Sequence, residues 1–302
     1  MFCGVINMDK FRILLSQLFI TFFGKKTKLI NDEYFNRFLY FLRTGRKANL
    51  DNPNTFNENI LYRKIFYDEY GLSFYTDKYE VRKYVEDKIG KEYVVPIFGV
   101  WNSVKDIDFS VIPQKFVLKS THGSGWNVVV KDRFNTDLSK ELKRLQKTLT
   151  CNYYYRSREK NYRDIIPRIL CESLLETINP KGLIDFKSYC YYGKTEFFEV
   201  TYIENGRVHQ SLFYRDLSKL GMINGHLDVQ VDELIREKKD IIIDLSEKLA
   251  QDFDFVRVDF YIADDDIYFS ELTFHSGGGI RPIKPESVDR KMGSFFKKEE
   301  RI

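Results

Sequence analysis

The stretch FVRVDFYIADDDIYFSELTF, residues 255–274, constrains the fold of this chain more than any other feature of its sequence. Two runs of β-branched and aromatic residues flank a short acidic turn, which is the pattern of a β-hairpin. Because side chains alternate between the two faces of a strand, Arg257 and Asp259 are expected on one face of the first strand. Glu271 and Thr273 are likewise expected to share a face of the second strand. The sequence therefore predicts a sheet that carries charged groups on one face.

The two carboxylates of this hairpin form a candidate cation site. Asp259 and Glu271 lie among large apolar residues, and a buried carboxylate is costly unless it is paired or bound to a metal. Carboxylate oxygens are the ligands that Mg²⁺ prefers, usually together with substrate phosphates. A surface hairpin with solvated acids is the alternative, and the apolar neighbours favour the metal site over it.

A second strand–loop–strand pattern lies in KFVLKSTHGSGWNVVV, residues 115–130. Lys119 comes before the glycines and a strand follows them, so the stretch fits neither a P-loop nor a GxGxxG turn, both of which open a helix. The small residues would let backbone N–H groups close over phosphate oxygens, with Lys119 as a point charge. On its own such a loop is more simply an ordinary hairpin. Together with the acidic hairpin it favours a phosphate site.

The rest of the chain indicates an α+β fold with mostly antiparallel strands. Residues 8–90 are expected to be mainly helical, with Asp77 as the N-cap of a helix that ends at Gly90. A helix at 234–253 is expected to place Leu234, Ile241, Leu245 and Leu249 along its apolar face. The other expected elements are a helix at 139–149 and strands at 94–100, 116–119, 128–130, 169–172, 187–192, 197–203, 255–262 and 267–273.

Charge is unevenly distributed along the 302 residues. The net charge of +4 is too mild to indicate nucleic acid, and we expect none as a partner. Residues 1–50 carry nine Lys or Arg against three Asp or Glu, a net +6, so the remainder is slightly acidic. A basic end on a near-neutral body suggests an anionic neighbour, whether lipid, polyanionic glycan or nucleic acid, and of these we favour the first two.

The apolar run at residues 13–23 has two interpretations. It is about half the ~20 residues that a membrane span needs, so a packed helix is the simpler one. The other is a peripheral contact of residues 10–28 with an anionic membrane, since Lys25, Lys26 and Lys28 follow the run. Four scattered cysteines without a CxxC pair, and no evident signal peptide, predict a cytoplasmic protein. The second interpretation would place it at the inner membrane face.

The motifs, taken in order, resemble the ATP-grasp superfamily, and in particular its TupA-like polysaccharide-biosynthesis branch. The resemblance covers residues 50–290, from TFNENILYRKIFYDEYGLSFYTDKYEVRKYV through KFVLKSTHGSGWNVVV, RILCESLLE and DFKSYCYYGK to FVRVDFY and IYFSELTF. It implies an ATP-grasp fold, with two α+β subdomains that clasp ATP behind a helical region. The implied domains are a basic helical region at 1–90, a small subdomain with the glycine-rich flap at 91–170, and a C-terminal subdomain with hinge and Mg²⁺ site at 171–302.

The resemblance also implies roles for individual residues. Lys119 would hold the α- and β-phosphates, and Arg257 would steady developing charge. Asp259 and Glu271 would bind Mg²⁺, and Thr273 stands where most ATP-grasp enzymes have an asparagine, so it is a weaker third ligand. The other implied nucleotide contacts are Lys78, the flap residues His122, Gly123, Ser124 and Gly125, the hinge residues Glu172, Ser173 and Leu174, and the pair Asp185 and Lys187.

The implied activity is an ATP-dependent carboxylate–amine ligase that works through an acyl phosphate. Its substrates would be an amino acid or amine and a uronic-acid carboxyl of a bacterial surface polysaccharide. Arg281, in the glycine-rich tail FHSGGGIRPIKP, is expected to grip the carboxylate or acyl phosphate, unless that tail is only a loose loop. Two alternatives stay open: a kinase that phosphorylates a glycan hydroxyl, with His122, His275 or Asp185 as base, and a non-catalytic nucleotide-binding component of a glycan-assembly complex.

Overall fold

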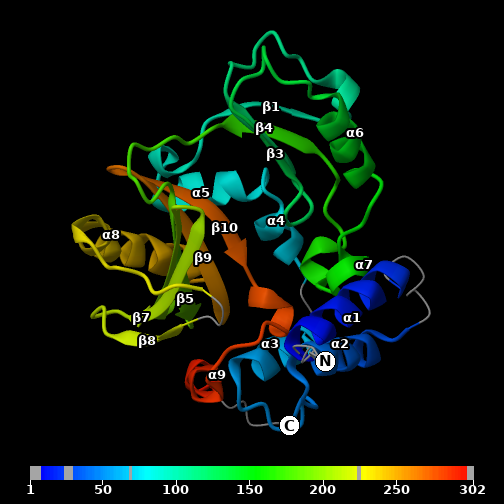
Figure 1. The fold of residues 1–302 in the computed structure, drawn as a ribbon, viewed down its shortest axis with the longest axis vertical. Helices are drawn as coiled ribbons and strands as arrows, with labels where there is room; N and C mark the ends of the chain where they lie inside the picture. Colours follow the sequence, from blue (N-terminus) through cyan, green and yellow to red (C-terminus); the bar gives the residue numbers. More distant parts are fainter. Residues whose placement is uncertain (1–7, 24–29, 68–69, 223–225, 298–302) are drawn as a thin grey trace, which may run out of the picture. The chain divides into compact units, whose positions relative to one another are not determined.

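The computed structural model describes residues 8–23, 30–67, 70–222 and 226–297 of the chain (Figure 1). The chain divides into two compact units, each assembled from separate segments. Unit 1 comprises Met1–Asp68, Tyr154–Lys160 and His275–Ile302, and unit 2 comprises Glu69–Tyr153 and Asn161–Phe274. The expected α+β architecture is confirmed, while the division into three consecutive domains stays a prediction.

Unit 1 is helical. Its elements are α1(Met8–Phe23), α2(Asp32–Thr44), α3(Phe56–Phe66), α7(Tyr154–Ser157), the 3₁₀ helix η5(Ser276–Gly279) and α9(Glu286–Gly293). The buried ammonium of Lys64 donates to the carbonyls of Gly278, at 2.7 Å, and Ser157, at 3.3 Å. The side-chain amide of Asn57 donates to Asp289 Oδ2 at 3.1 Å. These polar bonds join the three segments of unit 1.

The smaller sheet of unit 2 has four described strands in the order β1-β4-β2-β3. They are β1(Ile97–Trp101), β2(Phe116–Ser120), β3(Asn127–Val130) and β4(Ile169–Ser173), and every neighbouring pair is antiparallel. The helix α6(Ser139–Thr148) supplies Leu145 to the same buried cluster as Phe116 and Leu118. Two further helices, α4(Leu72–Thr76) and α5(Val81–Ile89), precede the sheet.

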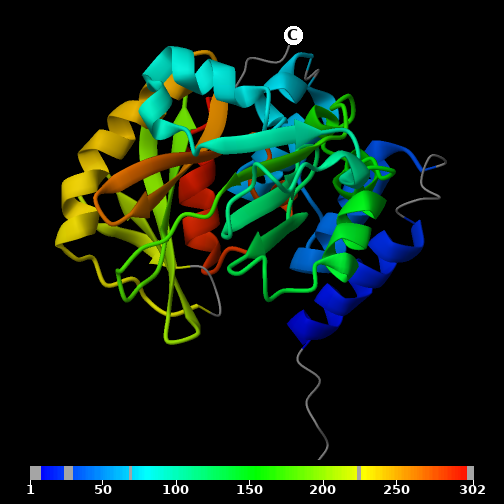
Figure 2. The same ribbon diagram turned by 90° about the horizontal axis from the view of Figure 1, so that it is seen from above.

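The larger sheet of unit 2 has six described strands in the order β10-β9-β5-β6-β7-β8, again antiparallel. They are β5(Ile184–Tyr191), β6(Lys194–Glu204), β7(Arg207–Tyr214), β8(Lys219–Met222), β9(Phe255–Ala263) and β10(Asp266–Thr273). The helix α8(Glu233–Ala250) covers one face, as Figures 1 and 2 both show. Phe186 and Phe198 stack in this core with ring centroids 4.4 Å apart. The opposite face is therefore left for polar groups.

Two expectations about this sheet need correction. β7 and β8 were not expected, because His209, Gln210 and Ser211 mask the apolar pattern of β7, which is buried between two neighbours. The apolar face of α8 is centred on Ile235, Ile242, Leu245 and Leu249, whereas Ile241 is exposed. Three consecutive isoleucines at 241–243 make the helical phase ambiguous by one residue, so the sequence pattern alone placed Ile241 wrongly.

The Phe186–Phe198 stack supports the strand from which the polar face of β5 projects, so its loss should reduce the stability of the whole protein. Phe186→Ala should lower the free energy of unfolding by about 3–5 kcal/mol, measured by urea denaturation. Phe134→Ala is the matched control, because Phe134 is 72% exposed; its effect should stay within ~0.5 kcal/mol. Equal effects of the two changes would contradict the assigned core.

Candidate functional site

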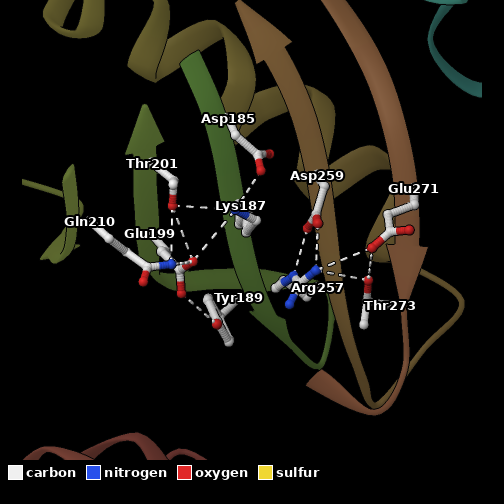
Figure 3. A network of polar contacts seen from close by, with 10 residues as sticks. All are labelled: Asp185, Lys187, Tyr189, Glu199, Thr201, Gln210, Arg257, Asp259, Glu271 and Thr273. Atoms are coloured by element: carbon white, nitrogen blue, oxygen red, sulfur yellow. Dashed lines mark hydrogen bonds and ion pairs between the residues drawn. The ribbon is translucent and has the colours of Figure 1, made fainter. Parts of the chain in front are cut away.

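The face of the larger sheet opposite α8 carries two neighbouring sets of charged and polar side chains, one around Lys187 and one around Arg257 (Figure 3). The strand register places Lys187 of β5 opposite Asp259 of β9, and Asp259 opposite Glu271 of β10. The predicted shared face is confirmed for Arg257, Asp259, Glu271 and Thr273. The other members of the two sets are Asp185, Tyr189, Glu199, Thr201 and Gln210.

A β-bulge is what brings β10 into this arrangement. The pairing of β10 with β9 shifts by one residue between Phe269, opposite Phe260, and Glu271, opposite Asp259. Ser270 is therefore an extra residue on β10. A shift of one residue moves every following side chain to the other face of a strand. Without the bulge, Glu271 and Thr273 would point toward α8.

The guanidinium of Arg257 contacts side-chain oxygens of three other residues of this hairpin. Arg257 donates from Nε to Asp259 Oδ1 at 2.7 Å and from Nη2 to Asp259 Oδ2 at 2.5 Å. Its Nη2 also lies 3.1 Å from Thr273 Oγ1 and 3.3 Å from Glu271 Oε1. The side chains of Arg257 and Asp259 are only 9% and 3% exposed, so this is a buried ion pair.

The protonation of the two carboxylates depends on burial and on the cations around them. Burial raises the pKa of Asp259 to about 7, although Arg257 acts in the opposite direction. Burial also opposes ionisation of Glu271, but the charges of Lys78 and Arg257 outweigh it, and the pKa of Glu271 is lowered. Lys78 lies between α4 and α5, ahead of the smaller sheet in the sequence, whereas Glu271 belongs to the larger sheet. Because the charge of Lys78 acts on Glu271, the two residues belong to one site.

The side-chain oxygens of this hairpin fit a Mg²⁺ ion that binds together with a nucleotide. The described residues contain no group of three or more His, Cys, Asp or Glu side chains that could enclose a metal ion by themselves. Asp259, Glu271 and Thr273 nevertheless direct oxygens at a single cation, Arg257. Mg²⁺ prefers oxygen donors and commonly takes one or two carboxylates, completing its shell with phosphates and water.

Lys187 lies between two carboxylates. Its Nζ is 2.5 Å from Asp185 Oδ2 and 3.5 Å from Glu199 Oε1. Burial opposes its charge, but Asp185 and Glu199 outweigh burial, so the pKa of Lys187 is raised. Burial raises the pKa of Asp185, against the effect of Lys187. Lys187 is therefore held as a cation on the polar face.

Glu199 is a site residue that the sequence analysis missed. It is fully buried opposite Lys187 in the β5–β6 register. Tyr189 donates its hydroxyl to Glu199 Oε2 at 3.1 Å, and the amide of Gln210 donates to Oε1. Glu199 lies between Phe198 and Val200, so the criterion that drew attention to Asp259, an acid among apolar residues, would have found it.

The glycine loop joins β2 to β3 as predicted. Ser120 N–H donates to the carbonyl of Trp126 at 2.9 Å and closes the loop. Lys78 Nζ donates to the carbonyl of Gly123 at 2.8 Å, and Lys119 forms an ion pair with Glu172. Gly125 has φ +72°, a left-handed conformation that favours glycine. The exposed tip is therefore Ser124–Gly125.

His122 supports this loop from inside. Its ring is buried against Trp126, with centroids 5.1 Å apart, and its Nε2 lies 3.0 Å from the carbonyl of Thr148. Burial lowers the pKa of His122. Because a carbonyl oxygen can only accept, Nε2 is the donor in the bond to Thr148. A contact of His122 with phosphate stays a prediction.

Arg168 is a second residue that the sequence analysis missed. It bonds Asp77 Oδ2 and Glu80 Oε1, both at 2.8 Å, and its carbonyl accepts from Thr121 N–H at 3.0 Å. Arg168 thereby fixes the Asp77–Lys78 turn beside the glycine loop. Arg168 opens the quoted motif RILCESLLE, but nothing in that motif indicated a partner for it, and only the fold brings it to Asp77.

The structure tests the predictions for the hinge at 172–174 and for the glycine-rich tail only in part. Glu172 and Ser173 end β4 as predicted, but Ser173 N–H donates to the carbonyl of Pro96 at 2.9 Å. The Ser173 N–H is therefore not available to adenine, and recognition of adenine by the hinge backbone stays a prediction. Arg281 and His275 belong to unit 1, where the carbonyl of Arg281 accepts from Asn57 at 2.9 Å. The role of Arg281 stays a prediction.

Comparison with known families and structures gives one strong match. A family model described as TupA-like ATPgrasp matches residues 58–297. No curated protein matches the chain.

Similar solved structures include a D-alanine–D-alanine ligase from Bacillus anthracis complexed with ATP (14% identity, 74% of this chain and 65% of that chain, TM-score 0.44). The ATP-grasp ligase PsnB, complexed with Mg and ADP, is 11% identical over 75% of this chain and 60% of its own (TM-score 0.39). An L-amino acid ligase from Bacillus licheniformis is 17% identical over 68% and 41% (TM-score 0.37). The chain thus spans less than two thirds of each. These likenesses are distant, and the family match carries the assignment.

The loop tip allows a matched test. Gly125 and Gly206 have the same φ of +72°, and a Cβ would meet nothing within 4 Å at either position. Gly125→Val and Gly206→Val should therefore each cost at least about 1 kcal/mol of stability through backbone strain. Only Gly125→Val should impair ATP turnover, by roughly 10²-fold, because only that loop would close over phosphate. Equal turnover of the two variants would show that the 120–126 loop is an ordinary hairpin.

Glu199 allows a second test. Glu199→Gln keeps the shape but removes the charge that holds Lys187, so kcat should fall by roughly 10²-fold with little change in melting temperature. Tyr189→Phe removes a hydroxyl from the same carboxylate but leaves its charge, and its kcat should fall less than about tenfold. Both are measured as ADP formation over a range of ATP concentrations. A similar loss in both variants would mean that packing, not charge, is what Glu199 provides.

Proposed function

Because the chain belongs to the TupA-like ATP-grasp family, we propose that it is an ATP-dependent, ADP-forming carboxylate–amine ligase. The observation that carries this proposal is the polar face of the larger sheet, where Lys187 and Arg257 stand beside the carboxylates of Asp259 and Glu271. Fixed cations next to oxygen donors for Mg²⁺ are what transfer of a γ-phosphoryl group requires.

The cations divide into two groups. Lys78 and Lys119 belong to the glycine-loop side, and each acts electrostatically on Glu271. Lys187 and Arg257 belong to the sheet. We assign the first pair to the phosphates that stay on ADP. The second pair would neutralise the charge that develops on the transferred group, since Arg257 is held rigidly by both oxygens of Asp259.

The proposed reaction has two steps. A carboxylate oxygen of one substrate attacks the γ-phosphorus of ATP, the bond to the β–γ bridging oxygen breaks, and ADP leaves with that electron pair. An amine then attacks the carbonyl carbon of the acyl phosphate, and inorganic phosphate leaves as the amide forms and the amine loses a proton. Bound Mg²⁺, held by Asp259 and Glu271 with Thr273 as a weaker donor, would supply charge neutralisation on the phosphate oxygens.

The proposed carboxylate substrate is a uronic acid of a bacterial surface polysaccharide, and the amine is an amino acid or a related compound. Family membership supports a role in polysaccharide biosynthesis. The net charge of +6 in residues 1–50 is compatible with an acidic glycan. Arg281 is the proposed grip on the acceptor carboxylate.

The structure gives little support to a kinase. A kinase needs a base beside the acceptor hydroxyl, yet Asp185 forms an ion pair with Lys187 and the Nε2 of His122 lies against the carbonyl of Thr148. The third candidate base, His275, belongs to unit 1, where its Nδ1 lies 3.9 Å from Glu159 Oε2. Incubation with Mg-ATP, glucuronic or galacturonic acid and a mixture of amino acids separates the candidates. ADP formation that needs both cosubstrates supports the ligase, and ADP with the sugar alone indicates a kinase. Tight ATP binding without ADP indicates a non-catalytic component.

The proposed metal-binding acids are tested by isosteric changes. Asp259→Asn and Glu271→Gln should each lower ADP formation by at least about 10²-fold, with the protein still folded by circular dichroism. Asp265→Asn, at a side chain 94% exposed in the same hairpin, should keep full activity. If either site variant keeps most of its turnover, the assignment of the metal to this hairpin is wrong.

A further inference from the structure

The helix α1 of unit 1 packs on one side and exposes apolar side chains on the other. Ser16 is fully buried, and Phe19 meets the rings of Phe35 and Phe38 of α2, with centroids 5.3 and 4.9 Å apart. Figure 1 shows the two helices side by side. The segment therefore forms a helix that packs on α2, but this packing accounts for only one of its faces.

The outward face of α1 is an apolar stripe. Phe11, Leu14, Leu15 and Leu18 are 37–53% exposed and follow the spacing i, i+3, i+4 and i+7 of a single helical face. On α2, Tyr34, Phe38 and Phe41 are exposed at the spacing i, i+4 and i+7. Phe38 touches Phe19, one turn after Leu15, so the exposed apolar surface extends from α1 onto α2.

Basic residues flank the stripe. Lys10 and Arg12 lie at the start of α1, and Lys25, Lys26 and Lys28 follow its end in the sequence, outside the described residues. Among the described residues, no helix combines the length and the apolar character needed to cross a bilayer. A helix with one exposed apolar face and basic flanks lies in the plane of an anionic membrane surface.

We propose that the α1 stripe, defined as Phe11, Leu14, Leu15 and Leu18, docks unit 1 onto an anionic lipid surface. The apolar side chains would enter the boundary between headgroups and acyl chains, and the net charge of +6 in residues 1–50 would favour an anionic surface. A second copy of the chain fits this face less well, because a symmetric pairing would bring together two segments that each carry a net charge of +6. The proposal does not depend on the ligase assignment.

The test is sedimentation of the full chain with lipid vesicles. The wild-type protein should bind mixed phosphatidylcholine–phosphatidylglycerol vesicles, bind pure phosphatidylcholine vesicles far more weakly, and be released by salt. Leu14→Gln with Leu18→Gln should weaken binding by at least about tenfold, since glutamine keeps the helix propensity of leucine. Ile178→Gln with Ile241→Gln is the matched control, because both residues are exposed aliphatics of unit 2; it should bind like the wild type.

A charge variant tests the basic flank separately. Lys25→Glu, Lys26→Glu and Lys28→Glu combined should also abolish binding to the mixed vesicles while circular dichroism stays unchanged. The proposal is overturned if the wild type does not sediment with mixed vesicles, or if it binds neutral vesicles equally well. It is also overturned if the leucine variant binds like the wild type. A dimer that the leucine variant converts to a monomer, with no vesicle binding, would assign the stripe to a second copy instead.

Discussion

The buried ion pair of Arg257 and Asp259 is the interaction on which the candidate site depends. The two side chains are only 9% and 3% exposed, and breaking a buried pair by removing one partner costs about 3–5 kcal/mol. Because both oxygens of Asp259 accept from the guanidinium, the pair has one geometry and also fixes where Thr273 and Glu271 meet Arg257. A single pair thus sets the positions of the groups that the proposed chemistry needs.

The same principle of mutual neutralisation extends across the polar face and onto the glycine loop. Lys187 is balanced by Asp185 and Glu199, and Lys119 by Glu172. Lys78 is balanced electrostatically by Glu271, against the desolvation that lowers its pKa. Charged groups of both signs are therefore fixed in position in a partly buried site. Such preorganised groups need little rearrangement when charge develops on a substrate. This arrangement is possible because α8 covers the opposite face of the sheet. The apolar core forms on that face, and the charged side chains occupy the other face.

Strand periodicity made much of this face predictable from the sequence. Alternation assigned Arg257, Asp259, Glu271 and Thr273 to one site before any contact was known, because a period of two is fixed by strand geometry. Contacts between distant segments were not predictable. Arg168 reaches Asp77 only through the fold. β7 carries polar residues at positions that the fold buries, such as Gln210 and Ser211, so its burial could not be inferred. Helical phase failed at Ile241 for a different reason, since consecutive isoleucines satisfy two phases equally.

The bulge at Ser270 shows that one further feature was readable. In DIYFSELTF the apolar residues Ile267 and Phe269 are in one phase of alternation, and Leu272 and Phe274 are in the other. All four are buried in the core under α8, which a regular strand cannot achieve, because positions three apart face opposite ways. An extra residue between Phe269 and Leu272 is the simplest way to bury both pairs. Burial of both apolar pairs therefore requires the bulge, and the bulge turns Glu271 and Thr273 toward Arg257. The packing of the apolar face of the sheet thus determines which side chains lie on its polar face.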